Sequence, residues 1–365
     1  MQTQEHGGDI YSASYRLDFS TNVNPLGTPV SVQRAVITSV GQLHQYPDVK
    51  CRELKRALSD TCRLPADWFV CGSGAAELIF AVAQAVRPKS ALLIIPGFTE
   101  YERALGASGC KDIRYYQCTR ASGFKVGEDI LDSISEDIDM MYVNNPINPT
   151  GIEIPHDLMI RIMEKCREER VVLVIDECFV NIMEHPEQAT MRGYVADDPG
   201  LFIIGAFTKL FAMPGIRLGY GITSNRLLMD QITACMQPWA LSVPAQAAGV
   251  AALKEADYVK KSRRLVAREL RFLKQTFERM GITYYDSSAN FLFFEGPKNL
   301  FDLCAKRGYL IRDCSNFRSL EPGYFRICVR TRRENEELCG YLESIFGRSG
   351  RYLPSYAEQG NGSEY

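Results

Sequence analysis

The chain has 365 residues, of which 46% are hydrophobic and 24% are charged, and its formal net charge is −2. This length is enough for a large core and usually for more than one domain, and the near-neutral charge excludes bulk attraction to nucleic acid or an anionic membrane. The start has no basic region before an apolar run, and no apolar window is long enough to span a bilayer, so we expect a cytoplasmic protein.

The twelve cysteines are scattered without a C-x-x-C pair, and the chain has only four histidines. Zinc sites need closely spaced Cys and His ligands, so we expect no metal. Free, mostly buried thiols in a reducing cytoplasm are the simplest interpretation.

From residue 51 to about residue 225, short apolar runs alternate with segments of helical spacing. The expected strands lie at residues 91–96, 139–146, 171–177 and 200–208. The expected helices lie at residues 75–86, 101–109 and 157–170. This alternation predicts an α/β fold in which helices cover both faces of a mostly parallel sheet.

The pattern changes after residue 256. The expected elements are a long amphipathic helix at 257–281, strands at 290–296, 308–314 and 324–330, a helix near 298–307 and a last helix at 332–347. We therefore predict four parts. They are an N-terminal segment packing with the small domain and active site (1–45), a large cofactor-binding domain (46–255), a small α+β domain (256–347) and a flexible tail (348–365).

Two stretches place small or amide side chains where an expected strand ends. "CGSGAAELIF" (71–80) puts Ser73 and Gly74 at a helix start, where free backbone N–H groups and the helix dipole attract an anion. A plain turn capped by Ser73 is the alternative. "NNPINPTG" (144–151) is broken by its prolines, and it is either a plain loop or a loop that points an Asn into a cleft.

Two further stretches end in a charge. Asp176 closes the apolar run "VVLVIDECF" (171–179), where it either caps the next turn or meets a protonated pyridine nitrogen. Lys209 follows "FIIGAFT" directly, so it also lies at a strand end. It is either a functional lysine or a lysine that extends its ammonium to water. A strand-end Lys, a strand-end Asp, an Asn in a Pro-rich loop, a Gly-rich helix start and the downstream Arg217 are together what a protein supplies to hold pyridoxal phosphate.

The order G-S-G-A-A-E, N-P-I-N-P-T-G, D-E-C-F and T-K…P-G-I-R-L-G-Y resembles the fold-type I pyridoxal-phosphate enzymes of the class I/II aminotransferase group. The resemblance covers residues 6–347. Within that group, "EHGGDIY", "LDFSTNVNPLG", "PGFTEYERALGASGC", "QPWALSVPAQAA" and "YLIRDCSNF" are similar to the threonine-phosphate decarboxylase family of cobalamin biosynthesis. That family is related to the histidinol-phosphate aminotransferases.

The resemblance implies roles toward pyridoxal 5'-phosphate. Lys209 matches the lysine that forms a Schiff base with it, Asp176 the partner of its pyridine nitrogen and Asn148 the partner of its phenolic oxygen. Phe98 matches the aromatic residue stacked on the ring. The other matching cofactor positions are Ser73, Gly74, Ala75, Thr208 and Arg217 around the phosphate, and Phe179. Tyr46 matches a tyrosine that reaches the cofactor phosphate of the partner subunit, which implies a homodimer.

The resemblance also implies substrate-binding residues. Arg326 matches the arginine that grips the substrate, and the other matching positions are His6, Gly7, Asn22, Asn148 and Arg312. Guanidinium groups suit phosphate and carboxylate, although surface salt bridges are the alternative for Arg312 and Arg330. The glycines beside His6 favour a segment that folds over a ligand, and the alternative for His6 is a disordered N-terminal residue.

Three residues depart from the pattern of the group. Ala206 stands where relatives have a phosphate-binding Ser or Thr, so one hydrogen bond to the phosphate is expected to be missing. Phe179 stands where the aminotransferases often have a Tyr, and Ile147 replaces the usual Asn or His. None of these changes affects Lys209 or Asp176.

The resemblance implies decarboxylation of L-threonine O-3-phosphate to (R)-1-amino-2-propanol O-2-phosphate and carbon dioxide, with O-phosphoserine as a second substrate. The nearest alternative is a histidinol-phosphate-type aminotransferase, which "EHGG" and "YLIRDC" disfavour, and a non-catalytic binding protein of this fold is a third. The grip of Arg326, Arg312 and His6 would decide which bond to Cα breaks, since orientation is worth about 7–11 kcal/mol at best.

Overall fold

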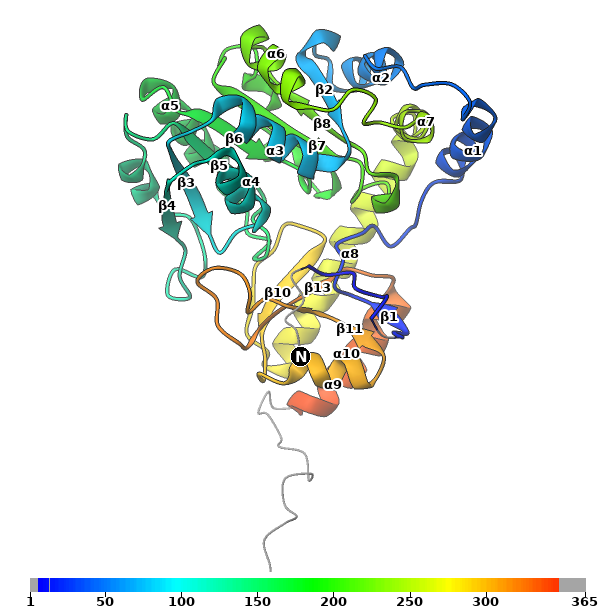
Figure 1. The fold of residues 1–365 in the computed structure, drawn as a ribbon. Coiled ribbons are helices and arrows are strands. Elements are labelled where there is room, and N and C mark those ends of the chain that lie inside the picture. Colours follow the sequence, from blue (N-terminus) through cyan, green and yellow to red (C-terminus); the bar gives the residue numbers. More distant parts are fainter. Residues whose placement is uncertain (1–5, 13, 348–365) are drawn as a thin grey trace, which may run out of the picture.

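The computed structural model describes residues 6–12 and 14–347. The chain forms a large part around a seven-stranded sheet and a smaller part around a four-stranded sheet (Figure 1). Helix α8 (Ala256–Met280) runs from the large part into the small one. The tail predicted at 348–365 lies outside the described residues, and the four-part division stays a prediction.

The large sheet has the strand order β2-β8-β7-β6-β5-β3-β4. Its strands are β2 (Phe69–Gly72), β3 (Ser90–Ile95), β4 (Asp112–Gln117), β5 (Met140–Asn144), β6 (Val172–Asp176), β7 (Leu201–Ala206) and β8 (Gly219–Ile222). All pairings are parallel except the two made by β8. The predicted α/β fold with a mostly parallel sheet is confirmed.

The central strands of this sheet are apolar on both faces because helices cover both faces. Every residue of β5 and β7 is buried, as expected for a sheet packed on two sides. The surrounding helices are α1 (Val30–Ser39), α2 (Arg52–Cys62), α3 (Gly74–Val86), α4 (Glu100–Ser108), α5 (His156–Glu168), α6 (Arg226–Cys235) and α7 (Val243–Ala252). Polar side chains stand instead at the carboxyl ends of the parallel strands, where β5 ends in Asn144 and β6 ends in Asp176.

The small part contains an antiparallel sheet in the order β12-β13-β10-β9. Its elements are β9 (Tyr284–Tyr285), β10 (Phe291–Glu295), α9 (Leu300–Lys306), β12 (Arg312–Asp313), β13 (Tyr324–Cys328) and α10 (Arg332–Phe346). A capping box of Thr331 and Glu334 starts α10. The core includes Phe277 of α8 and Phe294 of β10, which pack edge to face at 5.0 Å.

The N-terminal segment belongs to both parts of the fold. Strand β1 (Leu17–Asp18) pairs in parallel with β11 (Tyr309–Leu310), and Phe19 enters the core of the small part. The chain then crosses to the large part, where α1 packs beside α7 (Figure 1). Residues near the N-terminus are thereby placed at the junction of the two sheets.

The structure differs from the predicted elements in two ways. The segment 308–314, predicted as one strand, is divided into β11 and β12, which pair with different strands. Several elements were not predicted, among them the edge strand β4 and the antiparallel strand β8. The short 3-10 helices, also not predicted, are Val40–Gln42, Ala66–Trp68, Glu128–Ser133, Val180–Ile182, Pro186–Gln188, Arg192–Tyr194 and Pro214–Ile216.

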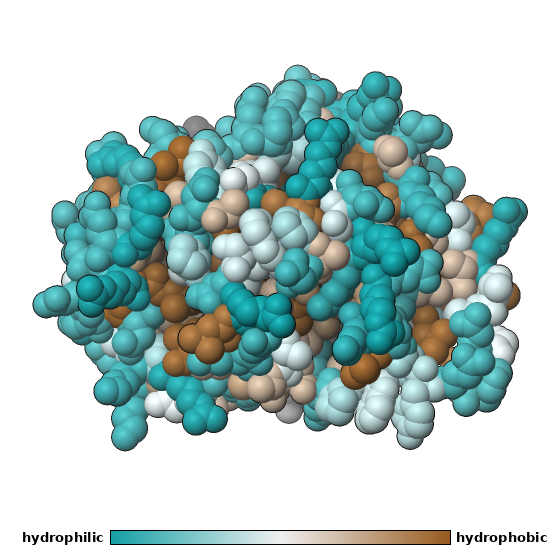
Figure 2. All heavy atoms as spheres, turned by 90° about the horizontal axis from the view of Figure 1, so that it is seen from above, coloured by the Kyte–Doolittle hydropathy of each residue, from teal (hydrophilic) through white to brown (hydrophobic). Residues whose placement is uncertain are grey.

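The outer surface has no extended apolar belt in the view from above. That face is mostly hydrophilic, with hydrophobic residues in separate small groups (Figure 2). Among the described residues, no helix has the length and apolar character needed to cross a bilayer.

Candidate active site

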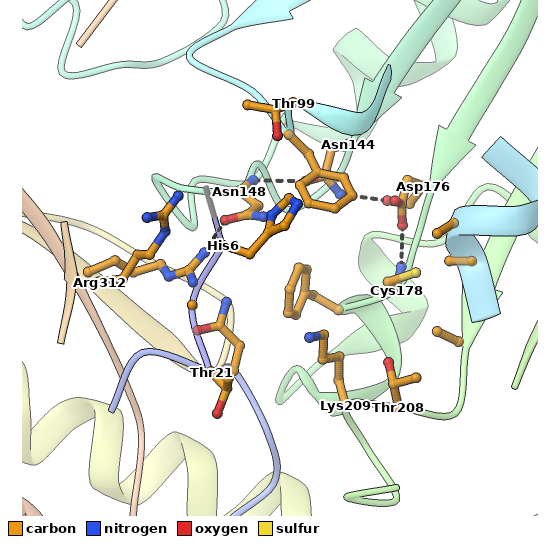
Figure 3. A pocket seen from close by; sticks show the side chains of 18 of the residues that line it. His6, Thr21, Thr99, Asn144, Asn148, Asp176, Cys178, Thr208, Lys209 and Arg312 are labelled. Carbon is orange, nitrogen blue, oxygen red and sulfur yellow. Dashed lines mark hydrogen bonds between the residues drawn. The ribbon is translucent and has the colours of Figure 1, made fainter. Parts of the chain in front are cut away.

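A cavity of about 250 Å³ lies where the carboxyl edge of the large sheet meets the small part and the N-terminal segment (Figure 3). Most of the residues predicted to bind cofactor or substrate line it. They are His6, Gly7, Asn22, Ala75, Phe98, Asn148, Asp176, Phe179, Thr208, Lys209, Arg217, Arg312 and Arg326. Ser73 and Gly74 lie just behind this lining, and Tyr46 lies elsewhere. The roles of these residues stay predictions.

Lys209 follows β7 at the sheet edge, and its amine points into the cavity (Figure 3). Its Nζ lies 5.9 Å from the centre of the Phe179 ring. Burial, followed by the positive charge of Arg326, lowers the pKa of Lys209. A lysine with a lowered pKa is more often a free amine, which is the nucleophilic form. The alternative of an ammonium extended into bulk water is therefore not what the structure shows.

Asp176 ends β6 next to Lys209 at the same edge. Its Oδ1 accepts a hydrogen bond from the backbone N–H of Cys178 at 2.9 Å, so the predicted turn cap is present as well. Burial raises the pKa of Asp176, while its hydrogen bonds and Lys209 act in the opposite direction. The carboxylate is therefore shielded from solvent at the cavity wall, where a protonated ring nitrogen would compensate its desolvation.

Two glycines let three segments meet at the start of α3. Gly74 has φ +81°, and a Cβ there would lie 2.5 Å from Nη2 of Arg217. A Cβ on Gly219 of β8 would lie 2.6 Å from the backbone nitrogen of Ala75. The helix start, β8 and the guanidinium are thus gathered around one point, as an anion site requires.

Ser73 does not act as the helix cap that the sequence left open. It occupies the N-cap position of α3, but its side chain makes no cap hydrogen bond. Its backbone N–H donates to Oε2 of Glu77 at 2.5 Å. The serine hydroxyl therefore does not stabilise the start of α3 as a cap.

Arg326 and Arg312 come from neighbouring strands of the small sheet and reach the cavity. Arg326 is buried, and it donates to Oδ1 of Asn148 and to the Ser20 carbonyl, the latter at 2.9 Å. Burial lowers the pKa of Arg326 to about 10, and its Nε has no partner among the described residues. Arg312 lies 5.3 Å from the Phe317 ring centre, and burial lowers its pKa too.

The N-terminal segment closes the cavity on the side away from the sheet. Nε2 of His6 lies 3.1 Å from Oε1 of Glu100, and its ring lies 6.4 Å from that of Phe98. Gly7 packs so closely that a Cβ would collide with the Ser20 carbonyl oxygen. Oδ1 of Asn22 is buried and has no hydrogen-bond partner within residues 6–12 and 14–347. This segment therefore carries polar groups that a polar ligand could satisfy.

Tyr46 and Arg330 do not line the cavity. Tyr46 is 81% exposed and packs against Trp239 with ring centres 4.9 Å apart, and it does not line the cavity of its own chain. Arg330 lies beyond the end of β13, where it was predicted within a strand. It donates to Glu334 at 2.6 Å and does not line the cavity, because α10 starts beside it. The salt-bridge alternative is correct for Arg330.

The three residues that depart from the group pattern, Ala206, Phe179 and Ile147, lie in different environments. Ala206 lines the cavity with a methyl group where a hydroxyl was expected in relatives. Phe179 packs on Phe291 with ring centres 5.1 Å apart. Ile147 is buried in the core of the large part, away from the cavity.

Sequence reasoning missed several residues of the site. Thr21, Thr99, Cys178 and Phe317 line the cavity, and Tyr101 donates to Oδ2 of Asp176 at 2.8 Å. The available signal was "PGFTEY", in which Thr99 and Tyr101 follow Phe98 at the start of a helix. Within the described residues, no cluster of three or more His, Cys, Asp or Glu could hold a metal ion.

The residues present fit the pyridoxal phosphate predicted from the sequence. Lys209 offers a buried amine, Asp176 offers a buried carboxylate, and the glycine cradle with Arg217 offers a phosphate site. These groups meet at one cavity, although they come from different strands and loops. That convergence is the chemical condition for holding this cofactor.

Comparisons with known proteins show the family of the chain. The profile of the family "Aminotransferase class I and II" matches residues 16–342. Threonine-phosphate decarboxylase from Salmonella typhimurium is 32% identical over 352 residues, covering 93% of this chain and 96% of that protein.

Two solved structures extend the comparison. The histidinol-phosphate aminotransferase from Clostridium acetobutylicum has a TM-score of 0.84 and 28% identity, covering 90% of this chain and 98% of that one. The histidinol-phosphate aminotransferase from Sinorhizobium meliloti, solved in complex with pyridoxal-5'-phosphate, has a TM-score of 0.80 and 18% identity, covering 91% of each chain. At that identity the second likeness concerns the fold alone.

Proposed function

The chain belongs to the aminotransferase class I and II family, and from this premise we propose that it decarboxylates L-threonine O-3-phosphate. The products would be (R)-1-amino-2-propanol O-2-phosphate and carbon dioxide. Its cofactor is pyridoxal 5'-phosphate, which when bound supplies an aldehyde for amines and a ring that accepts an electron pair.

Each group of the cofactor has a proposed partner in the cavity. Lys209 would bind the aldehyde carbon, Asp176 the ring nitrogen and Asn148 the phenolic oxygen, with Phe98 against the ring. The phosphate would be held at the start of α3, by backbone N–H groups and by Arg217. Ala206 has no hydroxyl, so we expect this phosphate site to have one hydrogen bond fewer, while Thr208 still offers its own hydroxyl.

The observation that carries the proposal is the number of basic groups on the substrate side. Besides Arg217, the cavity is lined by Arg312, Arg326 and His6. Buried guanidinium groups need compensating anions, and a substrate with both a carboxylate and a phosphate supplies two. An amino acid without a phosphate would offer these basic groups one anion instead of two.

The reaction must break the bond from Cα to the carboxylate and place a proton on Cα. Arg326 and Asn148, which are hydrogen-bonded to each other, would hold one end of the substrate, and Arg312 and His6 the other. Lys209 is the group that we propose as the proton donor to Cα, because its lowered pKa lets it gain and lose a proton readily.

A histidinol-phosphate-type aminotransferase is the second candidate. Its specific support is the likeness to an aminotransferase structure at 28% identity over 90% of the chain. The same cationic groups would hold a phosphorylated amine in that reaction. The two candidates differ in their need for a second substrate, because an aminotransferase needs a keto acid as amino acceptor and a decarboxylase does not. A non-catalytic protein would bind the cofactor without turning over either substrate.

We further propose that the protein works as a homodimer. Large apolar side chains are exposed along α1 and the segment that follows it, namely Val30, Ile37, Val40, Leu43, Tyr46 and Val49. Trp239 extends this face, and its ring packs against that of Tyr46 at a tilt of 37°. An exposed apolar face of this kind marks an interface, and a second copy seated there would bring Tyr46 toward its cofactor phosphate.

The metabolic setting is part of the same proposal. By the family resemblance, the product would enter the nucleotide loop of cobalamin, and O-phosphoserine would be a second substrate, since one methyl group is worth only about 1–3 kcal/mol. All twelve cysteines are free thiols, which is compatible with the predicted cytoplasm.

The deciding experiment supplies L-threonine O-3-phosphate to the cofactor-loaded protein without a keto acid. Repeated turnover with release of carbon dioxide supports the decarboxylase. Conversion of the cofactor to its amine form, with turnover only after a keto acid is added, replaces it by the aminotransferase. Lys209→Ala serves as the control, because it removes the proposed proton donor and is expected to abolish turnover in both cases.

A further inference from the structure

Tyr101 lies in the first turn of α4 with its side chain buried beside Asp176. Its hydroxyl donates to Oδ2 of Asp176 at 2.8 Å, while the backbone N–H of Cys178 donates to Oδ1 at 2.9 Å. Each carboxylate oxygen therefore has one fixed donor. With both oxygens held, the carboxylate has one orientation at the cavity wall.

The charges around Asp176 show what the hydroxyl does. The titratable groups that face it are Tyr101 from α4, Cys178 from the turn after β6 and Lys209 from the turn after β7. Burial raises the pKa of Asp176, and the hydrogen bonds from Cys178 and Tyr101 oppose this rise. Burial and the neighbouring carboxylate raise the pKa of Tyr101 well above its usual value, so it remains a neutral donor.

The ring of Tyr101 cannot turn away, because it belongs to a packed aromatic row. Phe98 meets it edge to face at 5.6 Å and 82°, and Tyr142 of β5 stacks on it at 5.0 Å and 10°. The hydroxyl of Tyr142 is itself fixed on the Ile79 carbonyl at 2.8 Å. Tyr101 thus contacts the proposed ring-stacking residue Phe98 with its ring and the carboxylate of Asp176 with its hydroxyl.

We propose that Tyr101 is a positioning residue for the cofactor's ring nitrogen, acting through Asp176. It holds the carboxylate in place and keeps it a hydrogen-bond acceptor, so that the bound ring nitrogen is held in its protonated form. This inference rests on the proposed cofactor site, and it does not depend on whether the reaction is decarboxylation or transamination.

The test compares Tyr101→Phe with a matched control, Tyr142→Phe. Both variants remove one buried hydroxyl from the same aromatic row and keep the ring, but only the first removes a donor to Asp176. Loss of a hydrogen bond to a charged group predicts that Tyr101→Phe releases pyridoxal phosphate about tenfold faster or more. Tyr142→Phe is expected to release it at the wild-type rate.

A second readout uses the protein without cofactor. Because the pKa of Asp176 is raised in the folded protein, its ionisation destabilises the fold, and this loss develops as pH rises through the folded-state pKa. Without the Tyr101 hydroxyl that pKa rises further. The melting temperature of Tyr101→Phe should therefore fall increasingly below wild type as pH rises from the folded-state pKa of Asp176 in wild type to the higher one in the variant, whereas the deficit of Tyr142→Phe stays constant with pH.

Each outcome decides the inference. Faster release together with the widening deficit, in Tyr101→Phe alone, supports it. Equal behaviour of the two variants overturns it and leaves Tyr101 a packing residue. Failure of the proposed function is separate, since a wild-type protein that does not bind pyridoxal phosphate at all would disprove the site itself.

Discussion

Gly74→Ala is expected to weaken binding of pyridoxal phosphate by about 10- to 100-fold. The added Cβ would lie 2.5 Å from Nη2 and 3.1 Å from Cζ of Arg217. The guanidinium would have to retreat by about 1 Å to reach ordinary contact distance. Loss of one charge-assisted hydrogen bond costs about 1.5–3 kcal/mol, and each 1.4 kcal/mol is a factor of about ten.

The control must separate this clash from backbone strain. Gly74 has φ +81°, where an alanine costs about 1–2 kcal/mol of stability by itself. Gly109, which ends α4, has φ +87° and nothing within 4 Å of an added Cβ. Gly109→Ala therefore carries the strain without the contact to Arg217.

The assay measures the dissociation constant of the cofactor and the melting temperature of the cofactor-free protein for both variants. Both should melt earlier than wild type, and only Gly74→Ala should bind the cofactor more weakly. Equal affinities in the two variants would refute the phosphate cradle of Gly74 and Arg217.

Three further predictions follow from the described charges. Burial, Arg326 and Arg217 lower the pKa of Lys209. Arg217→Ala should therefore raise that pKa and move the midpoint of cofactor attachment to higher pH. An unmoved midpoint in a pH series contradicts this. Arg326→Lys keeps the charge but loses the forked contacts, so the KM for L-threonine O-3-phosphate should rise about 10- to 100-fold, which steady-state kinetics can check. Burial acts to raise the pKa of Glu269, but hydrogen bonds led by Arg332 hold it below the ordinary value. Its stabilisation is lost as pH falls through the folded-state pKa, and thermal melts should show that Glu269→Gln lacks this acid-dependent part.

Burial on both faces decides which strands could be predicted from the sequence. β6 and β7 were placed within about two residues, because strands covered on both faces are continuous apolar runs. β4 is partly exposed along its length, so "DIRYYQ" carries no such signal. The segment 308–314 reads as one strand, and only tertiary pairing divides it between β1 and β13.

The site shows the same division between local and tertiary information. Lys209 and Asp176 were predicted because each is a charge that closes an apolar strand, and strand ends share an edge. The pairs His6 with Glu100 and Tyr101 with Asp176 join residues that are far apart in the sequence. Neither residue pattern indicates its partner, so these contacts could not be inferred without the fold.

The parallel pairing of β1 with β11 has a consequence for biosynthesis. Leu17 is synthesised long before its strand partner Tyr309, because almost the whole described chain lies between them. The strands of the large sheet, from Phe69 to Ile222, are contiguous in the chain and can assemble first. A nascent chain that reaches Ile222 already contains Lys209, yet it lacks Arg326 and the strand β11 that pairs with β1. The proposed substrate side of the cavity is therefore completed after the strands that carry the proposed cofactor residues Lys209 and Asp176.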